Sequence, residues 1–245
     1  MTTLVDDSRF VSYLLGRGQS RNIRQLNMYP DLRAEPWYDP SLFPITRALE
    51  ESVGAIKDEI SRIGTGGFHP EKENIAREGN WDTLPLYQRG RKNVPNCFAC
   101  PVTTEIIESY DTIRTLAGLI YFSRLGPHSR VAAHAGPTNL RLRCHLGLSI
   151  PTGECGLRLA GINYTWAQDK CIIFDDSFVH EVWNSSEKER VVLIVDLWHP
   201  DLSQREILLL KTLHAYTAVQ GEALNRYWRT YDAGVKTAHR PREYD

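Results

Sequence analysis

The sequence predicts a mainly β fold, a jelly roll or a barrel, flanked by α-helices. Between Arg114 and Pro200, short apolar runs follow one another closely and are separated by turn residues such as Gly126-Pro127 and Gly153. Closely spaced short strands over about 90 residues are typical of jelly rolls and barrels. The segments before and after this core have apolar residues at helical spacing instead. We therefore expect a β core over residues 114–200 with helices on either side.

The N-terminal part, residues 1–113, is predicted to contain an irregular arm, one helix and loops. Prolines punctuate residues 1–40, as expected of an arm without regular structure that packs on the domain. From Ser41 to Ile63, apolar side chains recur at three- and four-residue steps, which predicts a helix that Gly64 ends. Residues 65–100 are rich in glycine and proline and are predicted to be loops.

Seven segments of the core have the composition of strands. They are residues 119–122, 139–150, 157–159, 164–166, 171–174, 178–183 and 191–198. After Pro200 the spacing of apolar residues becomes helical again, which predicts C-terminal helices and a tail over residues 201–245. Together the three parts predict a single domain over residues 1–245.

Composition and charge exclude several classes of protein. The net charge of −1 and the mixed charge pattern argue against a nucleic-acid partner and against attraction to a membrane surface. The longest apolar run, Val191–Leu197, contains Asp196 and is far shorter than the roughly 20 residues of a membrane helix. We also expect no signal peptide, and the five cysteines form an odd set that does not suit a disulfide scaffold. These features predict a cytoplasmic protein without membrane insertion.

Polar side chains alternate with apolar ones along the expected strand 139–150. Period two places four of them on one face: Arg141, Arg143, His145 and Ser149. Alone, this pattern is typical of a solvated outer face. Its neighbours indicate a site instead, because His134 precedes the strand, Asp175–His180 forms a second charged segment, and Arg190 opens the next strand. Histidines on different strands of one barrel can converge on its axis, where a metal and a small anion fit.

These residue types have a specific chemical meaning. Imidazole suits Fe(II) and leaves other positions open for 2-oxoglutarate, O₂ and water. A dicarboxylate co-substrate needs a basic partner, and arginine binds a carboxylate through two parallel hydrogen bonds. An alternative is a non-catalytic β-barrel that binds a small acid. Such a barrel would use Arg143 and Arg190 but would not need both His134 and His180.

Three sequence blocks in order resemble the aspartyl/asparaginyl β-hydroxylase family. The blocks are His134–Leu148, Phe174–Trp183 and Val195–Pro200, with weaker likeness upstream through Leu86–Arg91 and Glu78–Trp81 to Met28–Pro30. The resemblance implies a double-stranded β-helix, a cupin-like jelly roll, with flanking helices. It also implies a dioxygenase that uses Fe(II), 2-oxoglutarate and O₂ to hydroxylate an unactivated carbon. In this reading His134 and His180 are the iron ligands.

The resemblance also implies how the co-substrate is held. Arg190, ten residues after His180, is expected to pair with the distal carboxylate of 2-oxoglutarate, with Ser123 beside it. Arg143 and His145 are expected to hold its other acidic end or an acidic group of the substrate.

Three further positions complete the expected site. Trp81 is expected to wall the co-substrate pocket, and Asp176 to orient an iron-bound water from the strand face of His180. Gly136 stands two residues after His134, where most oxygenases of this class have a carboxylate ligand. The family shares this absence, but so do 2-oxoglutarate-dependent halogenases, which place chloride on the open iron position. Halogenation therefore remains an alternative to hydroxylation.

The substrate implied by the resemblance is an aspartyl, asparaginyl or related amino acid, hydroxylated at its β-carbon. It can be a small molecule, carrier-bound or peptidyl. Thr104 stands where secretory-pathway relatives have a cysteine, which also fits a reducing compartment.

Overall fold

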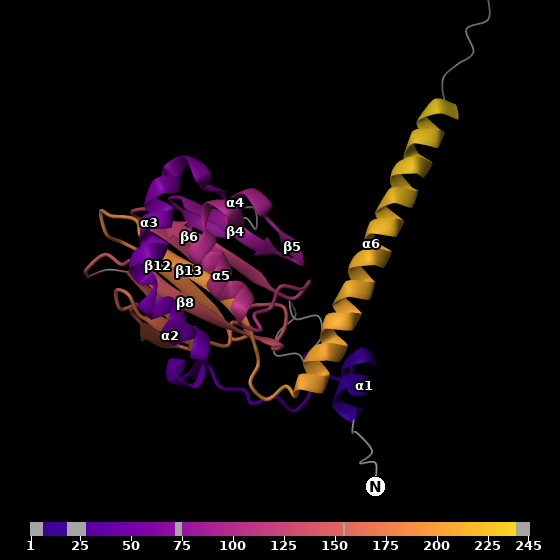
Figure 1. Cartoon of the computed structure of the whole chain (residues 1–245), viewed down its shortest axis with the longest axis horizontal. Helices are drawn as coiled ribbons and strands as arrows, with labels where there is room; N and C mark the ends of the chain where they lie inside the picture. The colour runs from indigo at the N-terminus through magenta and orange to yellow at the C-terminus, as the bar shows by residue number, and fades with distance from the viewer. Residues whose placement is uncertain (1–6, 19–27, 72–74, 154, 239–245) are drawn as a thin grey trace, which may run out of the picture.

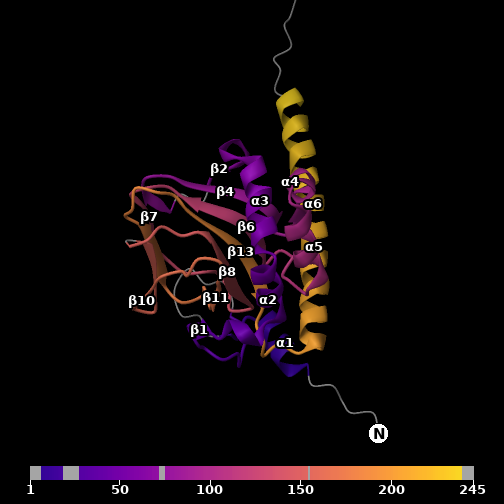
Figure 2. The same cartoon turned by 60° about the vertical axis from the view of Figure 1, so that its left-hand side comes forward.

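The computed structural model describes residues 7–18, 28–71, 75–153 and 155–238 (Figure 1). Within them two antiparallel β-sheets pack face to face (Figure 2). The larger sheet has eight strands, in the order β1 (Trp37–Tyr38), β11 (Cys171–Phe174), β8 (Arg141–Ser149), β13 (Arg190–Trp198), β6 (Leu119–Leu125), β4 (Trp81–Gln88) and β2 (His69–Pro70), with β5 (Arg91–Lys92) also paired to β4. The smaller sheet has the order β10 (Ile162–Tyr164), β9 (Cys155–Leu159), β12 (His180–Asn184), β7 (Ser129–His134) and β3 (Ala76–Glu78). This is the predicted double-stranded β-helix, and the fold class is confirmed.

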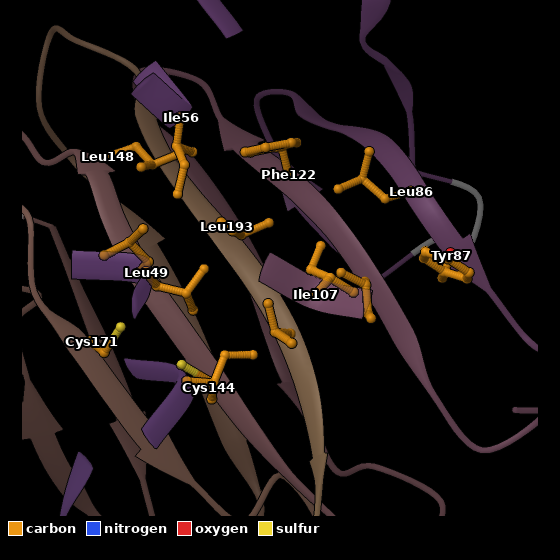
Figure 3. Packing of buried hydrophobic residues seen from close by; sticks show 14 of the residues in the cluster. Leu49, Ile56, Leu86, Tyr87, Ile107, Phe122, Cys144, Leu148, Cys171 and Leu193 are labelled. Carbon is orange, nitrogen blue, oxygen red and sulfur yellow. The ribbon is translucent and has the colours of Figure 1, made fainter. Parts of the chain in front are cut away.

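Helices cover the outer face of the larger sheet (Figure 2). The described α-helices are α1 (Ser8–Leu14), α2 (Pro44–Glu51), α3 (Val53–Ile63), α4 (Val94–Ala99), α5 (Pro101–Ser109) and α6 (Gln204–Ala238), and the 3₁₀ turns are Pro40–Leu42 and Thr65–Gly67. Leu49, Ile56 and Ile107 from three of the helices pack on apolar strand residues such as Leu193 (Figure 3). None of the described helices combines the length and apolar composition of a membrane span.

Strand β8 shows how the sequence pattern positions the site. Its even-numbered residues, such as Cys144 and Leu146, lie in the apolar cluster under the helices. Its odd-numbered residues Arg141, Arg143 and His145 face the other way, into the space between the sheets, and all three are buried. The interpretation of the polar face as a solvated outer face is therefore wrong for these three, and the charged face lines the interior.

Several N-terminal elements differ from the prediction. The expected helix 41–63 is two helices, α2 and α3, which meet at Ser52. The expected arm contains α1 and β1, and the expected loops contain β4, which forms although Pro85 cannot donate a backbone hydrogen bond. A shift in strand register next to Pro85 accommodates that missing donor.

Two differences lie elsewhere in the chain. Strand β7 is unpredicted, so that His134 ends a strand where we expected it to precede one. At the C-terminus one long helix, α6, stands where we expected helices, and residues 239–245 of the predicted tail lie outside the described residues.

Candidate active site

His134 and His180 meet at one end of the smaller sheet. They are direct partners in the ladder between β7 and β12, and their ring centroids are 4.1 Å apart. The Nδ1 atom of His134 lies 2.7 Å from the carbonyl oxygen of Ala132, and that of His180 lies 2.9 Å from the carbonyl oxygen of Phe178. Because a carbonyl only accepts, both Nδ1 atoms carry the proton and both Nε2 atoms carry the lone pair that a metal needs.

The electrostatics of His180 also suit a metal ligand. Its side chain is buried, and burial followed by the proximity of His134 lowers its pKa to about 3. The imidazole is therefore neutral near pH 7, the form that coordinates a metal. Among the described residues no cluster of three or more His, Cys, Asp or Glu side chains has metal-site geometry, so the protein offers two histidines without a third such ligand.

A buried network of two arginines and two aspartates lies beside the histidine pair. Arg141 contacts Asp176 at 2.8 Å and Asp196 at 3.2 Å, and Arg143 contacts Asp196 at 2.9 Å and Asp176 at 3.3 Å. Burial alone would raise the pKa of Asp176, but the charges of Arg141 and Arg143 outweigh it and hold that pKa well below its usual value. Arg143 is thus already paired with carboxylates of the protein, and any acidic ligand that it binds must share it with them.

Asp176 fills the space beside Gly136. A Cβ atom at position 136 would lie 2.6 Å from the carboxyl carbon of Asp176, and the Gly136 amide donates to the backbone oxygen of Asp176 at 2.7 Å. The space that Gly136 leaves beside His134 is therefore occupied by a carboxylate. Glycine is required here because a Cβ would clash with Asp176, and not because of the backbone conformation, since its φ does not lie in the left-handed region.

The segment around Asp176 is a turn, which corrects the expectation that it shares a strand face with His180. Strand β12 begins only at His180, and the backbone amide of Ser177 donates to the Asp175 carboxylate at 2.9 Å. An aspartate that binds the amide two residues later competes with strand pairing and favours a turn. The turn directs the Asp176 side chain to Arg141.

Arg190 has no carboxylate partner among the described residues, although only 2% of it is exposed. One guanidinium nitrogen donates to Ser123 Oγ at 3.4 Å, and Nε is buried without a hydrogen-bond partner. Ser123 Oγ also accepts from the Trp81 indole at 3.0 Å. Burial lowers the pKa of Arg190, and the Cys155 thiol that it contacts acts in the opposite direction. A buried guanidinium group without a carboxylate partner is stabilised when an anion binds to it.

His145 adds a second donor to the same region. Its Nδ1 accepts a hydrogen bond from the Trp166 indole at 3.2 Å, so its proton is on Nε2, which is buried without a partner. Burial and the charges of Arg190 and Arg143 hold the pKa of His145 well below its usual value, so the ring is neutral. Unpartnered donors on Arg190 and His145, both in contact with Trp166, fit the carboxylate of a small acid.

A cleft opens beside the histidine pair. Its lining includes His134, Arg141, Arg143 and Asp176, with Trp81 of β4 and Tyr121 of β6. The other predicted site residues adjoin this lining: His180 packs on His134, Ser123 binds the Trp81 indole and Arg190, and His145 is linked to Arg190 through Trp166. The sequence analysis gave no role to Arg141, Trp166 or Cys155. Strand alternation already placed Arg141 on the charged face, but no local pattern marks Trp166.

Comparison with known proteins identifies the family. A family model described as aspartyl/asparaginyl beta-hydroxylase matches residues 50–200. The aspartyl/asparaginyl beta-hydroxylase of Mus musculus is 38% identical in an alignment of 205 residues, which covers 79% of this chain and 28% of that protein. The aspartate beta-hydroxylase domain-containing protein 2 of Xenopus tropicalis is 38% identical in an alignment of 198 residues, which covers 76% of this chain and 53% of that protein. This chain accordingly spans between about a quarter and a half of these relatives' lengths. The chain belongs to the aspartyl/asparaginyl β-hydroxylase family.

Proposed function

We propose that this protein is a dioxygenase that uses Fe(II), 2-oxoglutarate and O₂ to hydroxylate an unactivated carbon. The observation that carries the proposal is the pairing of two histidines whose Nδ1 atoms donate to the backbone with unpartnered buried donors on Arg190 and His145. His134 and His180 would hold the iron through Nε2. When bound, the iron and its co-substrate supply the oxidation of the substrate carbon; the protein residues orient the reactants and exclude water.

The anion pocket is assigned to 2-oxoglutarate. Arg190, with Ser123 beside it, would bind the distal carboxylate, since Ser123 accepts from Trp81 and Arg190 and keeps its own hydroxyl proton to donate. His145 would donate from Nε2 to the co-substrate, and Trp81 would wall the pocket. Asp176 keeps its place beside Gly136 through Arg141 and would accept from a water near the histidine pair.

The two arginines of the cleft favour an acidic substrate. Arg141 and Arg143 line the cleft beside His134. Both also pair with Asp176 and Asp196, and a substrate carboxylate would bind beside these ion pairs. The proposed substrate is thus an aspartyl, asparaginyl or related amino acid, free, carrier-bound or peptidyl, modified at its β-carbon.

Two alternatives fit the structure less well. A halogenase needs space for chloride at the position opened by Gly136, and here the carboxylate of Asp176 lies in that space and repels an anion. A non-catalytic barrel that binds a small acid has no use for two histidines with their lone pairs directed away from the backbone. We further infer a cytoplasmic location, which agrees with five buried cysteines that are all free thiols.

Product analysis tests the proposal. Purified protein with Fe(II), 2-oxoglutarate and isotopically labelled O₂ is incubated with free aspartate and asparagine, with carrier-tethered amino acids and with aspartyl peptides. We expect one substrate class to gain a single labelled oxygen, detected by mass spectrometry. A chlorinated product in the presence of chloride, or label incorporation that does not depend on 2-oxoglutarate, would contradict the assignment.

A further inference from the structure

We propose that Trp166 is a positioning residue for the co-substrate: its indole fixes His145 as the Nε2–H tautomer and supports the guanidinium of Arg190. This inference rests on the proposed function, because it treats the pocket as the 2-oxoglutarate site. It gives a role to a side chain that contacts neither the histidine pair nor the cleft in the described contacts. Trp166 lies in the segment between β10 and β11, and 3% of it is exposed.

The contact with His145 determines where the imidazole proton lies. The indole Nε1 donates to His145 Nδ1 at 3.2 Å, and the two ring planes are 10° apart with centroids at 6.0 Å. An indole nitrogen can only donate, so His145 Nδ1 must be the acceptor and the proton must stay on Nε2. Phe174 packs edge-on against the same imidazole, at 4.9 Å, and restricts its rotation. The outcome is one buried donor, His145 Nε2–H, which has no partner within the protein.

The contact with Arg190 holds the second donor. The guanidinium carbon lies 4.9 Å from the centre of the Trp166 ring, within the range of a cation–π contact. Ser123 and Cys155 are its other described contacts, and neither carries a formal negative charge. The aromatic face thus offsets part of the cost of burying an unpaired cation, and it leaves Nε without a partner and ready for a carboxylate.

One residue therefore couples two donors that come from different strands. His145 is on β8 and Arg190 is on β13, and Trp166 contacts both. Without the indole N–H, His145 Nδ1 would be a buried acceptor without a partner, and the ring would exchange the proton between its nitrogens. In the Nδ1–H form, Nε2 presents a lone pair to the co-substrate carboxylate and repels it.

Two substitutions separate these contributions. Trp166→Phe removes the N–H donor and keeps an aromatic face under Arg190, whereas Trp166→Leu removes both. Trp198→Phe is the matched control, because Trp198 is also buried and stacked on a histidine, His214, and its indole nitrogen has no partner to lose. Thermal melting of each variant reports whether it folds.

The first readout is calorimetric titration of 2-oxoglutarate into Mn(II)-loaded protein without O₂. We expect wild type and Trp198→Phe to bind alike, Trp166→Phe to bind about tenfold more weakly, and Trp166→Leu to bind about a hundredfold more weakly. Equal affinity of Trp166→Phe and wild type would overturn the inference. Failure of the wild type itself to bind 2-oxoglutarate would instead contradict the proposed function.

The second readout needs neither metal nor co-substrate. NMR of the imidazole nitrogens in the metal-free protein, assigned with His145→Gln, gives the tautomer directly. We expect the Nε2–H form alone in wild type and a mixture in Trp166→Phe. The Nδ1–H form in wild type would overturn the inference even if the variants did not fold.

Discussion

The imidazole rings of His134 and His180 lie 4.1 Å apart because the two residues are direct cross-strand partners. Each ring is also fixed by a hydrogen bond from Nδ1 to the carbonyl oxygen two residues before it, at 2.7 Å and 2.9 Å. The backbone therefore presets both the distance and the tautomer of the pair. A metal that bound to both Nε2 atoms would find the two rings already oriented, which would reduce the entropic cost of binding.

Replacing either histidine should abolish metal binding. With two protein ligands, His134→Ala or His180→Ala leaves one, and changes that only disturb ligand orientation already cost about 10- to 100-fold in metal affinity. We expect losses beyond that range and no turnover, measured by Fe(II) titration without O₂ and by succinate formation. His128→Ala is the control, because His128 is exposed and contacts Glu187 on the surface. Near-normal turnover of either ligand variant at limiting iron would show that the assignment is wrong.

Arg190→Lys should raise the 2-oxoglutarate requirement much more than the substrate requirement. Lysine keeps the charge but cannot form the two parallel hydrogen bonds that arginine makes with a carboxylate. Because the pocket is buried, water does not replace the lost hydrogen bond. The expected rise in KM for 2-oxoglutarate is about tenfold or more. Arg124→Lys is the control, since Arg124 pairs with Asp82 away from the pocket. If KM for 2-oxoglutarate does not change, the carboxylate is bound elsewhere, and Arg143 becomes the next candidate.

Adding a side chain at position 136 should displace Asp176. Even Gly136→Ala places a Cβ 2.6 Å from the Asp176 carboxyl group, which Arg141 holds in place. Overpacking of this kind costs about 1–3 kcal/mol, so we expect a lower melting temperature and reduced turnover for Gly136→Ala and Gly136→Asp. Gly54→Ala is the control, because it lies in α3 with no atom within 4 Å of the added methyl. Wild-type turnover by Gly136→Asp would show that Asp176 does not need this space.

Asp176→Asn should lower the free energy of unfolding and make that free energy depend less on pH under acidic conditions. It leaves Arg141 and Arg143 short of one buried carboxylate, and breaking a buried pair costs about 3–5 kcal/mol. Asp82→Asn, in the partly exposed pair with Arg124, should cost about 1 kcal/mol or less. Urea unfolding of both variants measures the difference, and equal losses would contradict the importance of the buried network.

The pH dependence follows from the depressed pKa of Asp176. A carboxyl whose pKa is lower in the folded state contributes stability above its unfolded pKa of about 3.9 and loses it as the pH falls towards the folded pKa. Wild-type stability should therefore fall below about pH 4, and more steeply than that of Asp176→Asn. Parallel acid profiles of the two proteins would exclude this contribution of Asp176.

Part of the fold and of the candidate site was predictable from the sequence, and each part that was not has its own physical reason. Alternation along β8 separated Cys144 and Leu146 from Arg143 and His145, but alternation alone does not say which face is inside. The charged face is buried because Arg143 finds Asp196, 53 residues away, and such pairing has no local signature. Strand β4 was missed because Pro85 disfavours a strand unless the register shifts to accommodate it.

The positioning contacts were the least predictable. Trp166 lies in an irregular segment, and its contact with His145 joins residues 21 apart in the chain. The resemblance of three ordered blocks to one family identified the iron ligands and the co-substrate arginine as candidates. It did not reveal that Asp176 occupies the space beside Gly136, which depends on a turn at residues 175–177.

We propose that the protein couples O₂ to 2-oxoglutarate through a metal held by His134 and His180. The most direct test is the simultaneous measurement of O₂ consumption and succinate formation by purified protein, with and without Fe(II) and 2-oxoglutarate, beside His180→Ala. We predict that succinate and O₂ turnover appear only with both additions, in equal amounts, and disappear in the variant. O₂ consumption without succinate, or succinate formation that survives in His180→Ala, would contradict the account.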